Sequence, residues 1–185
     1  MERTHEWWLS RRGMGPEVRV STIVQPHEDP EIVVLAVRNV FPDWVPSEEI
    51  GRRSFPHAGS VDVLHGNAGS IDMFLESITK QRILDTALDA MTLDMEGSDY
   101  TDFSISRQAA LVGKISFSLG ERTTGGTIDV SIQGEDIGQW VEKLTWHQGR
   151  TAIPRVVGDG LSMADDGTPI EWFDKRGRPT IGEDD

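Results

Sequence analysis

Three side chains within residues 103–117 could bind an anionic ligand: Arg107, Gln108 and Lys114. A guanidinium group forms paired hydrogen bonds with phosphate, whereas an ammonium group acts as a compact point charge. The stretch therefore suggests an edge of the protein that contacts phosphate or RNA. The alternative is that these side chains pair with nearby carboxylates, because surface ion pairs are common in folded proteins.

The Gly113-Lys114 pair is similar to the end of a phosphate-binding loop. Such a loop also needs an earlier glycine, so that its backbone can surround the phosphate, and a hydroxyl residue that holds magnesium. Here the earlier glycine is missing and Ile115 follows the lysine. The pair is therefore not predicted to bind a nucleotide, and we expect no cofactor.

Metal ligands do not occur at a recognisable spacing. A group of acidic residues is similar to a calcium loop, but Gly97 is misplaced for an EF-hand and no glutamate closes the loop with two oxygens. This group consists of Asp94, Glu96, Asp99 and Asp102. The five histidines show no paired ligand spacing, and the chain has no cysteine. We therefore expect no metal site and interpret the acidic group as a solvated turn.

Catalytic motifs are also missing from the sequence. No serine lies in a Gly-x-Ser-x-Gly turn, and no glycine-rich fingerprint follows the first predicted strand. We therefore expect a noncatalytic protein. An enzyme whose active site assembles from distant residues is the third hypothesis, after the two binding hypotheses given below.

The chain is strongly acidic. Its 31 acidic residues outnumber its 18 basic residues, only four of which are lysines, and its formal net charge is -13. Such a surface suits a salt-rich cytoplasm, where ions screen self-repulsion, and it disfavours nonspecific binding of nucleic acid. The alternative is an acidic protein that meets a basic partner.

The sequence predicts a soluble cytoplasmic protein. The lack of cysteine fits a reducing compartment. No apolar run approaches the roughly 20 residues that a membrane helix needs. Glu2 and Glu6 also stand where a signal peptide would carry basic residues. We expect no membrane contact.

Hydrophobic periodicity predicts the elements that position these residues. The helix that Asp29 caps has few polar positions, so we expect it to be largely buried. The second helical region has two apolar stripes that fall out of phase near Lys80 and Gln81, which predicts a kink or two consecutive helices. Strands are predicted at 17–24, 61–65 and 127–132 with two more within 103–118, and helices at 30–41, 71–95 and 135–147.

These elements predict an α+β fold with an antiparallel or mixed sheet of about five strands and helices packed on one face. The length of 185 residues favours a single core domain, which we place at 17–147. Residues 1–16 are an N-terminal extension with Trp7 and Trp8, and Met14 is a candidate for the true start of the protein. Residues 148–185 are a C-terminal extension with a small hairpin at 170–177.

Three segments together resemble a family of uncharacterised archaeal proteins. They are His-Glu-Asp-Pro-Glu at 27–31 leading to Asn-Val-Phe-Pro at 39–42, Gln-Arg-Ile-Leu-Asp-Thr-Ala at 81–87, and Arg-Gln-Ala-Ala-Leu-Val-Gly-Lys at 107–114. The resemblance covers about residues 17–147 and implies a fold similar to the ribosomal protein that binds five-S RNA. It implies no catalytic residues. The chain departs from the family pattern at Ser106-Arg107, where Asn-Lys is expected, and at Gly125-Gly126.

Two binding hypotheses follow. The first is a noncatalytic protein that works near RNA or the translation machinery through Arg107, Gln108 and Lys114. The second is a protein-interaction module, in particular a homodimer, that uses an apolar sheet surface or the Trp7/Trp8 arm. The first rests on fold analogy, because function belongs to sites rather than to folds.

Overall fold

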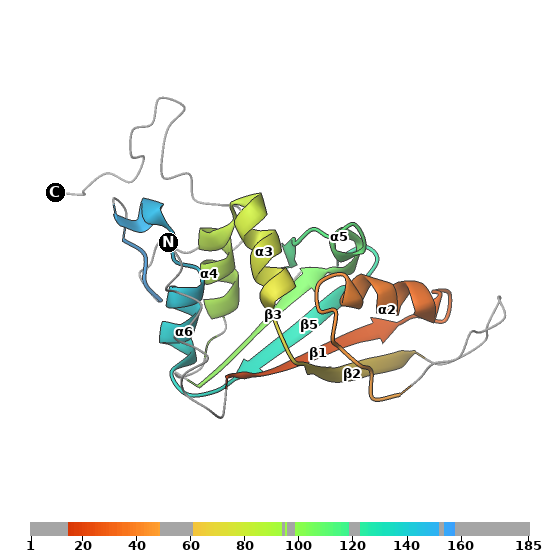
Figure 1. The fold of residues 1–185 in the computed structure, drawn as a ribbon. Helices are drawn as coiled ribbons and strands as arrows, with labels where there is room; N and C mark the ends of the chain where they lie inside the picture. Colours follow the sequence, from red (N-terminus) through yellow and green to blue (C-terminus); the bar gives the residue numbers. More distant parts are fainter. Residues whose placement is uncertain are drawn as a thin grey trace.

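The fold is built on a five-stranded antiparallel sheet (Figure 1). The computed structural model describes residues 15–48, 61–93, 95, 99–118, 123–151 and 154–157. The elements in chain order are β1 (Glu17–Val24), α2 (Pro30–Arg38), β2 (Asp62–Ala68), α3 (Asp72–Gln81), α4 (Leu84–Thr92), β3 (Tyr100–Ser106), α5 (Arg107–Leu111), β4 (Phe117–Ser118), β5 (Thr127–Gln133), α6 (Ile137–Leu144) and the short 3-10 helix η1 (Gln148–Thr151). The strand order is β2-β1-β5-β3-β4, and every neighbouring pair is antiparallel. The predicted α+β fold with helices and a five-stranded sheet is confirmed.

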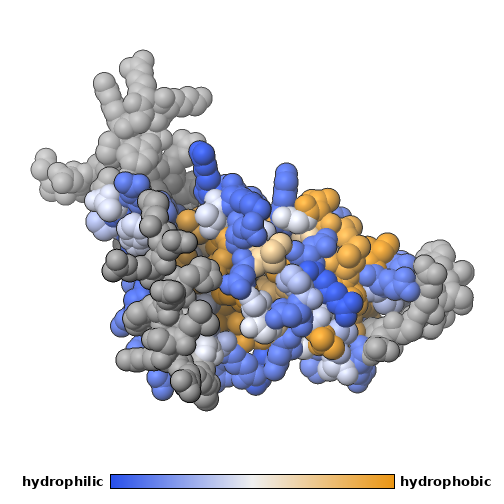
Figure 2. All heavy atoms as spheres, in the orientation of Figure 1, coloured by the Kyte–Doolittle hydropathy of each residue, from blue (hydrophilic) through white to orange (hydrophobic). Residues whose placement is uncertain are grey.

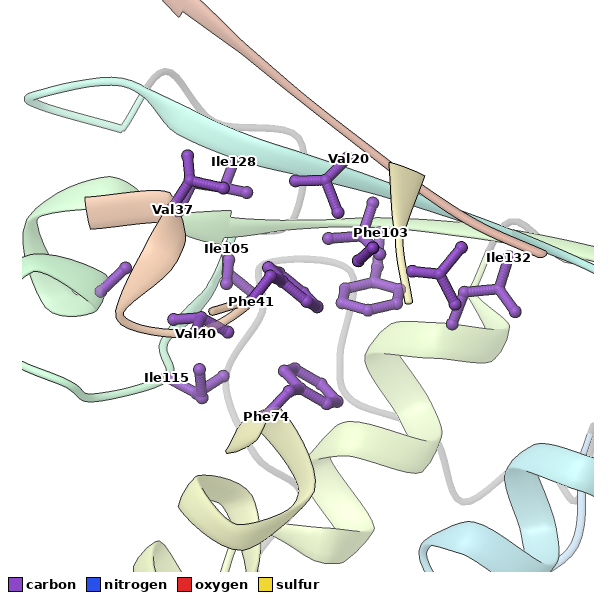
Figure 3. Close-up of a cluster of buried hydrophobic side chains, with 14 of the residues drawn as sticks. Val20, Val37, Val40, Phe41, Phe74, Phe103, Ile105, Ile115, Ile128 and Ile132 are labelled. Carbon is purple, nitrogen blue, oxygen red and sulfur yellow. The ribbon is translucent and has the colours of Figure 1, made fainter. Parts of the chain in front are cut away.

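One face of the sheet is apolar and is covered by helices. Val20 of β1 lies opposite Val130 of β5, which in turn lies opposite Phe103 of β3. All three side chains are buried. Figure 1 shows α2, α3 and α4 on the same side of the sheet, and Figure 3 shows the sheet residues pointing toward them. The period of two along each strand thus separates a core face from an open face.

Helix α2 begins as predicted but ends earlier. The side chain of Asp29 accepts a hydrogen bond from the backbone N–H of Glu31 at 2.9 Å, and Pro30 takes the first helical position. The helix ends at Arg38 rather than at Phe41, although the N–H of Phe41 still donates to the carbonyl oxygen of Val37 at 2.8 Å. The expectation that this helix is largely buried is wrong, since Ile32 and Leu35 are about half exposed.

The second helical region consists of two helices, as predicted. Helix α3 ends at Gln81, and Arg82 takes a left-handed conformation with φ 59° before α4 begins. At this break the side chain of Gln81 is free to pair with the backbone of Ile115. Its amide nitrogen donates to the carbonyl oxygen at 2.7 Å, and its amide oxygen accepts from the N–H at 2.8 Å. The break therefore ties the helical layer to the segment before β4.

The stretch 103–118 contains the two expected strands and, between them, a helix that was not predicted. Strand β3 ends at Ser106, whose side chain accepts a hydrogen bond from the N–H of Ala109 at 3.4 Å and caps α5. Ala109, Ala110 and Leu111 favour a helix, and short apolar runs do not distinguish strand from helix. The strand that follows, β4, has only two residues.

Three expectations lie outside the described residues: the Trp7/Trp8 arm, the start at Met14 and the hairpin at 170–177. The proposed domain boundaries at 16 and 147 stay a prediction.

The core predicts a large effect for truncation of Phe74 on α3. This ring is 1% exposed, and its centroid lies 5.5 Å from that of Phe103 and 6.2 Å from that of Phe41. Phe74→Ala should lower the free energy of unfolding by about 3–5 kcal/mol, because it removes apolar contacts and leaves a cavity. Chemical denaturation measures this change. Met73→Ala, at an exposed neighbouring position, should change it by about 0.5 kcal/mol or less; equal effects would contradict the core described here.

Candidate binding surface

Arg107 lies at the centre of a buried hydrogen-bonded cluster. Its guanidinium donates from Nε to the carbonyl oxygen of Gly125 at 2.8 Å and from Nη1 to the hydroxyl of Thr22 at 3.3 Å. It also donates to the carbonyl oxygen of Ile23 and forms a salt bridge with Glu28. The Arg107 side chain is 6% exposed and the Glu28 side chain 18% exposed. Burial of this charge is compensated by its carboxylate partner and by carbonyl acceptors.

The turn at Gly125 and Gly126 fits closely around this cluster. Both glycines have positive φ values, 83° and 80°, which other residues rarely adopt. A Cβ atom on Gly126 would lie 2.6 Å from Nη2 of Arg107, and one on Gly125 would lie 2.5 Å from Cγ of Gln108. The glycine pair therefore lets the turn approach α5 and accept the hydrogen bond from Arg107.

The three predicted contact residues thus differ in what they can do. Arg107 is buried in an ion pair, so it does not fit the expectation of a surface contact with RNA; pairing with a carboxylate, the alternative, is what the structure shows for it. Gln108 and Lys114 are exposed at the start of α5 and just after it. The predicted trio therefore contributes one cation to the surface.

The segments that carry the family resemblance come together around α5. Glu28 from the first segment contacts Arg107 from the third. The side-chain amide of Asn39 donates to the carbonyl oxygens of Leu111 at 2.9 Å and Ala110 at 3.3 Å. Gln81 from the second segment pairs with Ile115, as described above.

Two further arginines are buried against α4. Arg150 donates from Nε to Asp85 at 2.9 Å, and Arg155 forms a salt bridge with Asp89. The two aspartates are four residues apart, so they lie on one face of α4. Sequence reasoning missed both pairs, although this spacing was a visible signal. The chain after α6 is consequently tied to the core at Arg150 and Arg155.

His147 and Asp85 form the only His–carboxylate contact that the described residues show, with Nε2 and Oδ2 2.9 Å apart. The other ring nitrogen, Nδ1, accepts a hydrogen bond from the N–H of Gly149 at 3.2 Å. Because both ring nitrogens are engaged, the imidazole offers neither a proton nor a lone pair to a substrate in this arrangement. Its position is consistent with a structural role.

The described residues also contain no group of three or more His, Cys, Asp or Glu side chains that could hold a metal ion. Asp94 and Glu96 of the calcium-like segment lie outside these residues.

Within the described part of the chain, no helix is long and apolar enough to cross a membrane.

The open face of the sheet is mostly polar. It presents small side chains such as Ser21, Ser104 and Ser131, and the hydroxyl of Ser104 donates to Asp129 at 2.7 Å. Arg19 on this face donates to Glu17 at 2.9 Å, and this hydrogen bond raises the pKa of Arg19. The apolar sheet surface expected for a homodimer is therefore not present across this face.

Exposed apolar residues on this face include Tyr100 on β3 and the pair Ile23 and Val63, which lie opposite each other on β1 and β2. Such a pair is small, and single exposed apolar residues are normal on protein surfaces.

A larger apolar surface lies on the helices. Ile32 and Leu35 of α2 are 51% and 52% exposed, and Leu111 and Val112, at the end of the adjoining α5, are 39% and 71% exposed. We call these four residues the α2–α5 patch. The hydrogen bonds from Asn39 to the end of α5 hold the two helices together. Figure 2 shows hydrophobic residues gathered over the region of α2. The i, i+3 spacing of Ile32 and Leu35 signalled a shared helix face but not its exposure.

The buried cluster predicts that Arg107 is needed for stability. Arg107→Met should lower the free energy of unfolding by about 3–5 kcal/mol, because it leaves the Glu28 carboxylate buried without its partner. Adding Glu28→Gln removes that charge and should recover part of the loss, as measured by chemical denaturation. Lys80→Met breaks the exposed pair with Glu76 and should cost about 0.5 kcal/mol or less. An Arg107→Met effect as small as this control would contradict the burial of the pair.

Comparisons with known proteins identify relatives in archaea. No protein-family model matches the chain. The chain is 33% identical over 132 residues to the UPF0201 protein of Aeropyrum pernix, a match that covers 69% of this chain and 83% of the relative. It is 30% identical over 143 residues to the UPF0201 protein of Methanothermobacter thermautotrophicus, covering 77% of this chain and 98% of the relative. It also matches 30% of the length of the longer UPF0200/UPF0201 protein of Archaeoglobus fulgidus, with 36% identity over 109 residues and 59% of this chain.

Solved structures show the same relationship. The UPF0201 protein of Methanococcus jannaschii matches with a TM-score of 0.54 and 26% identity, over 70% of this chain and 99% of that one. A second structure, of an uncharacterised UPF0201 protein, matches with a TM-score of 0.56 and 26% identity, over 68% of this chain and 90% of that one. The shared sequence and the shared sheet lead to one conclusion: the chain belongs to the UPF0201 family of archaeal proteins.

Proposed function

We propose that this protein is a noncatalytic cytoplasmic binding module that acts by contact with another protein through the α2–α5 patch. The observation that carries the proposal is the exposure of four adjoining apolar side chains in an otherwise acidic protein. Contiguous exposed apolar surface marks interaction sites, whereas scattered single residues do not. The patch lies on two helices that hydrogen bonds hold together, so it is formed before a partner arrives.

The distribution of charge favours a protein partner over RNA. Affinity for nucleic acid depends on lysine and arginine side chains that neutralise phosphates. Arg107, Arg150 and Arg155 are buried in salt bridges, so they are removed from the surface of a chain whose net charge is already -13. The exposed surface is therefore poorer in cations than the sequence suggests.

RNA binding through Gln108 and Lys114 is the alternative. It rests on the expected similarity to the ribosomal protein that binds five-S RNA, which stays a prediction. The names of the UPF0201 relatives state no activity. An enzyme remains the third hypothesis.

The proposal predicts that Leu35→Glu abolishes association with the partner. A carboxylate in the centre of the patch would have to lose its water on binding, which is costly. The tagged protein and its variants would be used to capture partners from an extract of the source cells, with and without ribonuclease. We expect a protein that is captured by the wild type in either condition and is lost with Leu35→Glu.

Met73→Glu is the matched control, because Met73 is a similarly exposed apolar residue on the neighbouring helix α3. Capture should survive this change and also Lys114→Ala. If capture instead depends on Lys114 and is lost with ribonuclease, RNA is the ligand and the proposal fails. Circular dichroism checks that each variant is folded.

A further inference from the structure

We propose that the α2–α5 patch binds the same patch on a second copy of this chain, with the two α2 helices antiparallel across a two-fold axis. This inference rests on the proposed function, since it names the partner of the same surface. It depends on the arrangement of charges around the apolar residues of α2.

The outward side of α2 carries one acidic and one basic residue at opposite ends. Glu31 and Arg38 are both exposed, as are Ile32 and Leu35 between them, and Arg38 also donates from Nε to the carbonyl oxygen of Trp44 at 3.5 Å. Residues seven positions apart lie two turns apart on nearly the same side of a helix, so Glu31 and Arg38 are separated by roughly 10 Å along the axis. The α2 surface therefore reads acidic, apolar, apolar and basic along its length.

This order is complementary to itself in the antiparallel direction. The midpoint between Glu31 and Arg38 lies within one residue of the midpoint between Ile32 and Leu35, which is about 1.5 Å along the axis. A two-fold axis through this point places Glu31 opposite Arg38 of the other copy, twice. It also brings Ile32 of each copy next to Leu35 of the other. A two-fold contact requires such self-complementarity, because the same surface serves both subunits.

The other two patch residues enlarge the contact on one side. Asn39 follows α2 and hydrogen bonds to the end of α5, so Leu111 and Val112 lie beside the C-terminal part of α2. Asn39, which contacts α5, is seven residues after Ile32. At 100° per residue the two positions lie on nearly the same side of the helix, so Ile32 is on the side that faces α5. The apolar contact thus extends from α2 to α5, whereas Glu31 and Arg38 form the polar rim.

The arrangement of charges allows a second copy to bind, although each copy carries a net charge of -13 and the two copies repel each other. The apolar surface carries no charge, and the two rim pairs are attractive only in the antiparallel orientation, so they select the orientation more than they add affinity. Salt screens the remaining repulsion between copies. Four side chains per copy make a small contact, so we expect a concentration-dependent dimer that salt strengthens.

Charge reversal tests the geometry directly. Sedimentation equilibrium of the full chain in high salt should show a dimer of twice 20.6 kDa. In about 0.15 M salt, where exposed pairs are only partly screened, Glu31→Arg and Arg38→Glu each turn two attractive rim pairs into repulsive ones and should each weaken the dimer by roughly tenfold. In high salt this difference should shrink. The double variant Glu31→Arg/Arg38→Glu restores complementarity and should dimerise like the wild type. A mixture of the two single variants should form a heterodimer, because one copy then carries two bases and the other two acids.

Helix α3 supplies matched controls. Asp72 and Lys80 occupy the first and last turns of that helix, as Glu31 and Arg38 do in α2. Asp72→Arg and Lys80→Glu should leave the dimer unchanged, which separates the rim contacts from effects of net charge and of the helix dipole. Denaturation curves show whether each variant is folded.

A chain that is monomeric at every concentration would overturn this inference, and so would single reversals that match the α3 controls or that are not rescued by the mixture. These outcomes leave the proposed function standing if Leu35→Glu still abolishes capture of a different protein. If Leu35 affects neither capture nor dimerisation, both proposals fail.

Discussion

The buried guanidinium of Arg107 contacts three segments of the chain. It contacts the end of β1 at Thr22 and Ile23, the segment before α2 at Glu28, and the turn before β5 at Gly125. Its own backbone N–H donates to the carbonyl oxygen of Gly126 at 3.1 Å. A side chain with five donors in a rigid plane can satisfy such a set of acceptors, whereas lysine cannot. Arg107 therefore fixes the start of α5, and Asn39 holds its end.

Burial of arginine with a carboxylate recurs in this chain and shapes its surface. Asp85 and Asp89 on α4 receive Arg150 and Arg155, which fastens the chain after α6 to the helical layer. Each of these pairs is costly to desolvate and is costly to break once formed, so each specifies a position more than it adds net stability. The consequence for function is electrostatic. Arginines that hold the fold together do not attract a polyanion.

The fold could be predicted from the sequence where local patterns act alone. Alternation in β1 and β5, the cap at Asp29 and the phase change near Gln81 all produced the expected elements. The helix at 107–111 was not predicted, because a short apolar run fits either a strand or a helix and the acceptors of Arg107 lie on other segments. Tertiary contacts between distant segments decided that choice.

The exposed apolar surface was harder to predict than the fold. An apolar helix such as α2 is expected to be buried, and only the arrangement of the layers shows that Ile32 and Leu35 face outward. Conversely, Arg107 is basic and was expected at the surface, yet its acceptors lie on segments that no local pattern connects.

The burial of Arg107 and the exposed apolar surface are connected. Burial of Arg107 fixes the start of α5, and Asn39 holds the end of α5 beside α2, the helix that carries Ile32 and Leu35. The residue that looked like a ligand contact thus acts on the surface indirectly, by positioning the helix that completes the apolar patch. Any change that frees its guanidinium would alter this surface even though Arg107 lies outside the patch.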